Sequence, residues 1–406
     1  MPRLSPFVGL VFDPSRVGPL ERVTAPPYDA ISPEERVRLQ RASEANIVRL
    51  ILSEERPGDD ADRNKYTRAS ALLRTWRDDG TLVPTDGPRI YPYEMRFRFR
   101  GEPRSVRGVI AAIGLEPWGG TILPHERTMS APVEDRLSLM RSVRTNLSPI
   151  YALLAGPCAP LADVLDKATT EQPLAELTDE AGVRHRMWAA DAPDALVEAV
   201  AAERLLIADG HHRYTMALRY QEEMRTLSGP GLWDSVMMLV VDGATEDPPV
   251  LPIHRVLVGA AAPLIGERVR DLEEVLTLVD DETVTVGTAS WEDGELVHRA
   301  GRLHGPPPAV CALHDGLVAS FSAAEITYQP DAVAAEEAVR TQTASSAVFL
   351  PPTRVERIRP IVERGERLPE KSTYFWPKPR TGMVIRPLDL AERGARPTPD
   401  PPVRAS

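Results

Sequence analysis

The clearest structural signal in the sequence is the alternation of apolar and polar residues at 91–99, which predicts a half-buried strand. Residues 106–115 are predicted to form its hairpin partner across a turn at Gly101 and Glu102. Short apolar runs predict buried strands, and apolar residues at helical spacing predict helices between them. The predicted buried strands are 149–154, 204–208 and 235–241, and the predicted helices are 66–77, 132–146 and 211–225.

This mixture of elements predicts an α/β class (mixed α+β) and a multi-layer globular protein. Ser32, followed by Pro33 and Glu35, indicates a capped helix start early in the chain. Domain boundaries are predicted at a Gly-Pro turn near residue 156 and where the composition changes. The predicted parts are an N-terminal α/β region at 1–156, a region with an Asp-Gly-His-His-Arg motif at 157–260, a C-terminal α/β region at 261–386, and a disordered tail at 387–406.

Length and charge narrow the class of protein. A chain of 406 residues is too long for one ordinary core, so it needs more than one domain. The net charge of −11 makes nucleic acid an unlikely partner and disfavours charge-driven binding to a membrane surface. Two cysteines and the lack of a long apolar run predict a soluble, cytoplasmic protein without a membrane partner. The oligomeric state is left open.

The sharpest chemical signal is the segment from Ala208 to Tyr214, where an apolar strand meets a helix. The start of a helix presents unpaired backbone N–H groups and attracts anions. Gly210 allows a phosphate to approach, Arg213 can bind two phosphate oxygens, and Tyr214 is a further phosphate-binding candidate. His211 and His212 are candidate catalytic residues, which add hydrogen-bond donors or metal-capable nitrogens. Asp209 could orient a hydroxyl, hold Mg²⁺ or act as a base. The structural alternative is that Asp209 caps the helix and the histidines are solvated.

Four other polar groups are candidates for substrate or phosphate binding. His125, Glu126 and Thr128 lie in one turn, with Glu126 as a candidate catalytic acid or base. The other candidates are Arg144 with Asn146, His254 with Arg255, and Lys371 with Ser372 and Thr373. Each also has a structural explanation, as a capped turn, a surface helix or a hydrogen-bonded core histidine. Lys371 stands out because the chain has four lysines: Lys65, Lys167, Lys371 and Lys378.

Several standard catalytic motifs are absent from the sequence. The chain has no G-x-x-x-x-G-K-[ST] loop, no G-x-G-x-x-G after a strand, no G-x-S-x-G elbow and no C-x-x-C pair. These absences disfavour P-loop enzymes, ordinary Rossmann dehydrogenases, α/β-hydrolases and zinc ribbons. A nucleotide must therefore be held in another way.

The chain resembles a bacterial and archaeal family defined by domain of unknown function 1015. The resemblance is carried by motifs that follow one another from residue 25 to residue 378. These motifs are 25–32, 123–128, 134–137, 146–150, 208–214, 251–255 and 365–378.

The segment from Asp209 to Arg213 is also similar to the phosphate-binding motif of the ParB/sulfiredoxin-like superfamily. Members of that superfamily bind nucleotide polyphosphates at a helix start and include kinases that phosphorylate free serine. The resemblance implies a ParB/sulfiredoxin-like nucleotide-binding core, with Asp209 near the transferred group and Arg213 and the histidines contacting phosphate. For the separate catalytic glutamate of those kinases, Glu126 and Asp29 are the candidates here.

The leading functional hypothesis is a phosphotransferase that uses Mg²⁺ and ATP or ADP to act on a small hydroxyl metabolite such as free serine or phosphoserine. Asp209 would bind the metal or the hydroxyl. One alternative is a metal-dependent phosphoester hydrolase that uses His125, Glu126, Asp209 and His211. The other is a nucleotide-dependent binding or switch protein without turnover.

Overall fold

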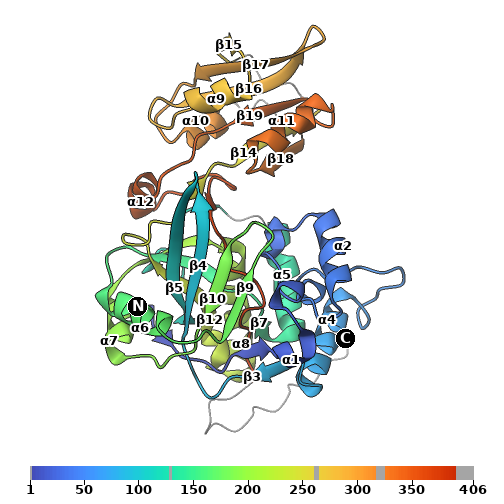
Figure 1. The fold of residues 1–406 in the computed structure, drawn as a ribbon, viewed down its shortest axis with the longest axis vertical. Helices are drawn as coiled ribbons and strands as arrows, with labels where there is room; N and C mark the ends of the chain where they lie inside the picture. The colour runs from blue at the N-terminus through green and yellow to red at the C-terminus, as the bar shows by residue number, and fades with distance from the viewer. Residues whose placement is uncertain (1, 128–129, 260–264, 317–324, 390–406) are drawn as a thin grey trace. The chain divides into compact units, whose positions relative to one another are not determined.

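The computed structural model describes residues 2–127, 130–259, 265–316 and 325–389 (Figure 1). The chain divides into two compact units. Unit 1 comprises Met1–Leu123, Thr128–Asp247 and Pro377–Ser406, and unit 2 comprises Pro124–Arg127 and Pro248–Trp376. Each unit is built on its own sheet.

Unit 1 is built on a nine-stranded mixed sheet, counted over the described residues. Its strands are β1 (Leu4–Ser5), β4 (Tyr91–Phe99), β5 (Glu102–Gly114), β6 (Ile122–Pro124), β8 (Ile150–Leu154), β9 (Ala175–Thr178), β10 (Arg184–Met187), β11 (Leu205–Asp209) and β12 (Ser235–Asp242). The order is β6-β11-β8-β12-β5-β4-β10-β9, and β1 also pairs with β5. β8 and β12 run parallel, which requires a long crossover connection between them, whereas β4 and β5 form the predicted antiparallel hairpin.

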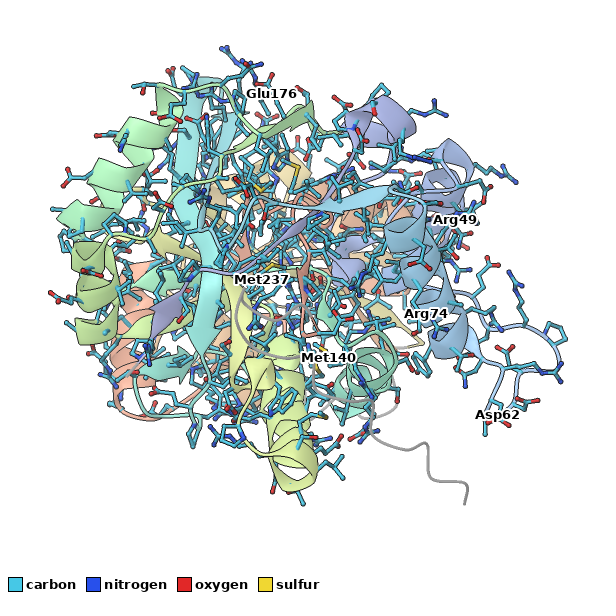
Figure 2. All side chains as sticks on the ribbon, turned by 90° about the horizontal axis from the view of Figure 1, so that it is seen from below. Arg49, Asp62, Arg74, Met140, Glu176 and Met237 are labelled. Atoms are coloured by element: carbon cyan, nitrogen blue, oxygen red, sulfur yellow. The ribbon has the colours of Figure 1, made fainter. Side chains whose placement is uncertain are left out.

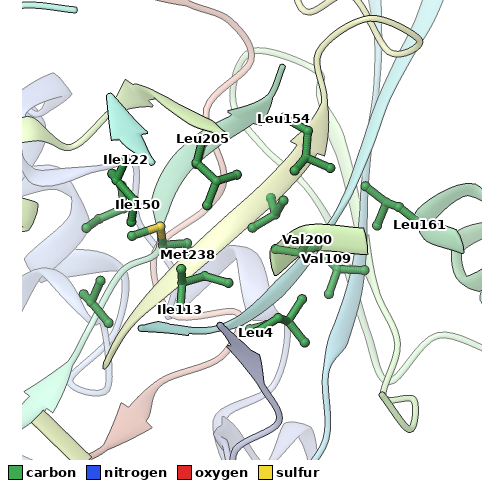
Figure 3. Close-up of a cluster of buried hydrophobic side chains, with 14 of the residues drawn as sticks. Leu4, Val109, Ile113, Ile122, Ile150, Leu154, Leu161, Val200, Leu205 and Met238 are labelled. Atoms are coloured by element: carbon green, nitrogen blue, oxygen red, sulfur yellow. The ribbon is translucent and has the colours of Figure 1, made fainter. Parts of the chain in front are cut away.

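The central strands of unit 1 are buried on both faces. Successive side chains of a strand point to opposite faces, so every second residue contributes to the same cluster. One cluster contains Val109 and Ile113 of β5, Ile150 and Leu154 of β8, and Met238 of β12 (Figure 3). The intervening residues Ile110, Tyr151 and Met237 are buried as well. A sheet covered on both faces is the centre of a layered fold.

Helices cover this sheet. The helices of unit 1 are α1 (Pro14–Val17), α2 (Pro33–Ala42), α3 (Val48–Ile51), α4 (Lys65–Asp78), α5 (Ser130–Val143), α6 (Ala159–Thr169), α7 (Asp194–Ala202) and α8 (His211–Ser228). Short 3-10 turns occur at Leu20–Arg22, Tyr28–Ala30 and Leu232–Asp234. The Ser32 side chain caps α2, as predicted, by accepting a hydrogen bond from the Glu35 N–H. Figure 2 shows Met140 and Met237 inside unit 1 and Asp62, Arg74 and Glu176 at its surface.

Two small sheets complete unit 1. The strand β2 (Leu10–Phe12) pairs with β3 (Leu82–Pro84), and β7 (Thr145–Asn146) pairs with β21 (Arg386–Pro387). The second pair joins the last described segment of the chain to the segment before β8.

Unit 2 is built on a six-stranded antiparallel sheet, again counted over the described residues. In order across the sheet, its strands are β15 (Glu267–Val269), β17 (Glu295–Arg302), β16 (Thr285–Glu292), β19 (Ser346–Phe349), β14 (His254–Val258) and β18 (Glu325–Gln329). The helix α10 (Ala309–Gly316) packs on one face, and α9 (Leu272–Leu278) and α11 (Ala332–Arg340) pack on the other. The remaining elements are α12 (Val355–Glu363) and the pair β13 (Val250–Leu251) and β20 (Tyr374–Phe375).

The observed architecture confirms the predicted mixed α/β class, but its units differ from the predicted ranges. β8 lies before Gly156 and pairs with β11 and β12, which lie after it, so the boundary predicted near 156 falls inside unit 1. Of the tail predicted at 387–406, residues 390–406 lie outside the described ranges. Within those ranges, no helix has the length and apolar character needed to cross a bilayer.

Candidate functional site

In unit 1, Asp209 is the last residue of β11, and Gly210 begins α8. The pairing of β11 with β8 shifts between Ile207 and Asp209, which is a β-bulge that turns the end of the strand. Gly210 has the left-handed φ of 99° and occupies the helix N-cap. The strand, glycine and helix are therefore arranged as the sequence predicted. Asp209 does not cap the helix, because Gly210 holds that position.

The carboxylate of Asp209 lies between two cations. One oxygen accepts a hydrogen bond from the Arg213 guanidinium, and the other lies 2.5 Å from the Lys378 Nζ. The Lys378 Nζ is also 3.7 Å from a carboxylate oxygen of Asp29. The side chains of Asp209, Arg213 and Lys378 are 11%, 8% and 9% exposed. We call Asp29, Asp209, Arg213 and Lys378 the Asp209 cluster.

Arg213 is held in place by further contacts within unit 1. Its Nη1 donates to the Pro149 carbonyl and, at 3.2 Å, to the Ser148 Oγ. Its Nε is buried and has no hydrogen-bond partner among the described residues. A buried N–H without a partner is costly, so this group is a donor that an anion could satisfy.

Three other residues of the motif lie in the first turns of α8. The His211 ring is buried and stacks on Trp118 at a centroid distance of 6.2 Å, whereas His212 is half-buried. Tyr214 is fully buried, and its hydroxyl donates to the Glu116 carbonyl at 2.7 Å. His211 and Tyr214 therefore pack into the structure instead of being solvated.

Tyr28 and Arg136 lie on another side of the Asp209 cluster. The guanidinium of Arg136 lies over the Tyr28 ring, 4.4 Å from its centroid. Burial, followed by the charge of Asp29, raises the pKa of the Tyr28 hydroxyl to about 12. Tyr28, Arg136, Ser148 and Arg213 line a small cavity of about 50 Å³. The Asp209 cluster thus adjoins this cavity through Arg213.

In unit 2, the Glu126 carboxylate is bound by a backbone turn. It accepts hydrogen bonds from the N–H groups of Lys371, Ser372 and Thr373 at 3.1, 3.0 and 2.9 Å, and from the Thr373 hydroxyl at 2.9 Å. The Nε2 of the buried His125 lies 2.7 Å from the same hydroxyl. The amide groups that could have bound a phosphate at this turn hold the chain's own carboxylate.

His254 and Arg255 are buried in unit 2. Burial, followed by the charge of Arg255, lowers the pKa of His254 to about 4, and its Nδ1 accepts a hydrogen bond from the Leu350 N–H at 3.2 Å. The Arg255 guanidinium donates to the Ile253 carbonyl at 2.7 Å and lies 4.9 Å from the centroid of the Tyr328 ring. These contacts fit a structural role for both side chains.

The other predicted site residues are distributed as follows. Asn146 is buried in unit 1, and its side-chain oxygen accepts hydrogen bonds from the Met237 N–H and the Arg386 Nη1 at 3.0 and 3.1 Å. Arg144 follows α5 with a positive φ of 45°. Thr128 lies outside the described residues. Of the set proposed for a hydrolase, His125 and Glu126 belong to unit 2, and Asp209 and His211 belong to unit 1.

Comparison with known proteins gives the family. The model of the family described as "Protein of unknown function (DUF1015)" matches residues 4–308. The chain belongs to this DUF1015 family. The match confirms the resemblance predicted from the motifs, although the motif at 365–378 lies beyond the matched residues. None of the curated proteins matches the chain.

Some solved structures are similar to this DUF1015 chain. "Free serine kinase in complex with AMP" has a TM-score of 0.37 and 13% identity, and the similarity covers 63% of this chain and 83% of that one. A conserved hypothetical protein from Pyrococcus furiosus has a TM-score of 0.36 and 14% identity, covering 63% and 86%. "SbnI with C-terminal truncation from Staphylococcus aureus" has a TM-score of 0.33 and 14% identity, covering 66% and 82%.

In the last motif of the DUF1015 chain, the sequence predicts Lys371 as a site residue and does not single out Lys378. Lys371 contributes its backbone N–H to the Glu126 turn, whereas the Lys378 ammonium is part of the Asp209 cluster. The scarcity of lysine in the chain gives no reason to prefer Lys371 over Lys378 as a site residue. Asp135 and Arg136 form a polar group in the sequence that a surface helix with salt bridges explains equally well, and Tyr28 belongs to the motif at 25–32.

The Asp209 cluster of the DUF1015 chain does not fit a protein-held Mg²⁺. Both carboxylate oxygens of Asp209 are engaged by Arg213 and Lys378. Across the described ranges, no group of three or more His, Cys, Asp or Glu side chains is arranged to hold a metal ion. Mg²⁺ is often bound through one or two carboxylates together with substrate phosphates. A divalent ion at this cluster would therefore need ligands other than the two Asp209 oxygens.

Replacing Gly210 of the DUF1015 chain with alanine should destabilise the cluster. The new Cβ would lie 3.0–3.1 Å from atoms of the Arg213 guanidinium, at a backbone φ that favours glycine. We expect a loss of about 1–3 kcal/mol in the free energy of unfolding, measured by chemical denaturation. Gly119→Ala is the matched control, because Gly119 has a φ of 91° and nothing within 4 Å of its Cβ position. Equal losses in the two variants would show that contact with Arg213 does not matter.

Proposed function

We propose that this chain is a small-molecule phosphotransferase that moves a phosphoryl group between a nucleotide, bound as its Mg²⁺ complex, and a metabolite hydroxyl. The proposal rests on the Asp209 cluster, in which two cations and two carboxylates meet beside the start of α8. Phosphoryl transfer depends mainly on positioning and on neutralising charge, which this combination of groups can provide.

In this proposal each residue of the cluster has a distinct task. Lys378 and Arg213 stabilise the negative charge on the phosphoryl oxygens, and Asp209 holds both cations in position. Asp29 accepts the hydroxyl proton, because its side chain is 24% exposed whereas that of Asp209 is 11% exposed. The bond between phosphorus and the leaving nucleotide oxygen breaks as the bond to the acceptor oxygen forms.

The first acceptor to test is free serine, with phosphoserine for the reverse direction. This choice follows from the resemblance of the Asp209–Arg213 segment to the motif of free-serine kinases. ATP and ADP are both tested as donors, because the geometry of the cluster does not distinguish a diphosphate from a triphosphate. Serine metabolism is thus the expected setting.

The experiment is transfer of labelled phosphate by the purified full chain, with Mg²⁺, from ATP or ADP to a panel of hydroxyl metabolites that includes serine. We expect transfer by the wild type and a loss of roughly 100-fold or more in Lys378→Met, because a buried cation facing the phosphoryl group is removed. Lys167→Met, at an exposed lysine of α6, should transfer normally. Wild-type protein that neither binds a nucleotide nor transfers phosphate across the panel would refute the proposal.

A further inference from the structure

A second, larger cavity lies in unit 1, beside α2, α4 and α5. It has a volume of about 580 Å³, within the range of small-molecule sites. Its charged lining residues are Arg36, Glu54, Glu55, Lys65, Asp135 and Arg136. We call this cavity the α4–α5 cleft. The roles proposed above use none of these six residues.

The charges of the α4–α5 cleft balance. Three cations and three carboxylates line it, and they are arranged in pairs. The Lys65 Nζ lies 2.9 Å from Asp135 and 3.0 Å from Glu55, and an Arg36 nitrogen lies 3.4 Å from Glu54. Arg136 donates to the Asp135 carboxylate through its Nε at 3.0 Å and through its Nη2. A polyphosphate carrying several negative charges would face three carboxylates here, so the α4–α5 cleft does not suit the phosphates of a nucleotide.

The α4–α5 cleft also offers donors for a carboxylate. The Arg36 Nε is buried and has no hydrogen-bond partner in the part of the chain that the structure describes. Arg136 is 9% exposed and is oriented by donating to the Ile51 carbonyl at 2.7 Å. A ligand carboxylate would satisfy the Arg36 Nε, and arginine is well suited to carboxylates because of its planar array of donors.

The α4–α5 cleft is continuous in its lining with the small cavity beside the Asp209 cluster. Ile51, Arg136 and Leu139 line both spaces. The small cavity is also lined by Tyr28 and Arg213. A ligand bound in the α4–α5 cleft would therefore share Arg136 with the small cavity that Arg213 lines.

We propose that the α4–α5 cleft binds a zwitterionic α-amino acid. Arg36 and Arg136 would bind its carboxylate, and Glu54, Glu55 or Asp135 its ammonium, which matches the balanced charge of the lining. The volume admits amino acids larger than serine, so the inference names the class and not one member. That this amino acid is the phosphoryl acceptor rests on the function proposed above; the binding itself does not.

The test is isothermal titration calorimetry of the full chain with L-serine, ethanolamine and glycerate. L-serine should bind at least tenfold more tightly than ethanolamine, which lacks the carboxylate, and than glycerate, which lacks the ammonium. Arg36→Met and Arg136→Met, which remove the two proposed carboxylate ligands, should each weaken L-serine binding by tenfold or more. The matched control is Arg41→Met, at an exposed position of the same helix α2.

Failure to bind any amino acid of a panel that includes larger hydroxyl amino acids would overturn the inference, as would equal binding of the three ligands. Competition between AMP and L-serine for one site would assign the α4–α5 cleft to the nucleotide and also overturn it. Should a variant not fold, Glu54→Gln, at a carboxylate that is 43% exposed, tests recognition of the ammonium in its place. Amino-acid binding without phosphoryl transfer would refute the proposed function and leave this inference standing.

Discussion

Asp209→Asn is expected to reduce phosphoryl transfer by a factor on the order of 10²–10⁴ and to lower the free energy of unfolding by roughly 3 kcal/mol. The substitution keeps the shape of the side chain and removes its charge. Arg213 and Lys378, both about nine-tenths buried, then lose the anion that holds them together. Transfer rates and chemical denaturation of the purified chain measure the two effects.

Asp163→Asn is the control for Asp209→Asn. Asp163 is exposed on α6, and its substitution should change neither quantity appreciably. Double-mutant cycles with Lys378→Met separate the contributions, since residues in one charged network should show a coupling energy of about 0.5–3 kcal/mol. Unchanged transfer by a folded Asp209→Asn protein would contradict the roles proposed for the Asp209 cluster.

Elements whose signal is local could be predicted from the sequence. The predicted strand at 91–99 is β4, and the helix predicted from His211 is α8. Alternation along a strand and a glycine between strand and helix depend on neighbouring residues, so one sequence contains the information. The segment from Ala208 to Tyr214 could be predicted as a candidate site from the same kind of local pattern.

Contacts between distant segments could not be predicted in this manner. Asp209 and Lys378 are 169 positions apart, and no periodicity links them. The motif from Gly365 to Lys378 is also divided, because unit 2 ends at Trp376 and unit 1 resumes at Pro377. Lys371 and Lys378 therefore serve different units, although they belong to one motif. The scarcity of lysine draws attention to the segment 365–378. It does not indicate which unit the side chains of Lys371 and Lys378 belong to.

The charge balance of the α4–α5 cleft also depends on contacts between segments that are distant in the sequence. Arg36 lies on α2, Lys65 on α4 and Asp135 on α5, three elements whose packing depends on the whole core of unit 1. Arginine is common in this chain, and the scarcity of lysine marks Lys65 no more than the other three lysines. Their importance follows from burial and from the cavity they share.

Glu126→Gln is expected to lower the free energy of unfolding by about 2–4 kcal/mol, because it leaves the turn at Lys371–Thr373 without its anion. A glutamine side chain offers one acceptor oxygen in place of two and turns an N–H donor toward one of the backbone N–H groups. The Glu126 side chain is 13% exposed, so water would not readily replace the lost hydrogen bonds. Amide hydrogen exchange should accelerate at Lys371, Ser372 and Thr373.

The same variant distinguishes a structural Glu126 from a catalytic one. If the carboxylate serves to bind the turn, Glu363→Gln, at an exposed residue of α12, should leave exchange unchanged, and Glu126→Gln should retain transfer within a few-fold under conditions where it is folded. If Glu126 is instead the catalytic acid or base that the sequence predicted, transfer should fall by a factor on the order of 10² or more while exchange at the turn stays slow. The four hydrogen bonds that its carboxylate accepts from the turn favour the first outcome.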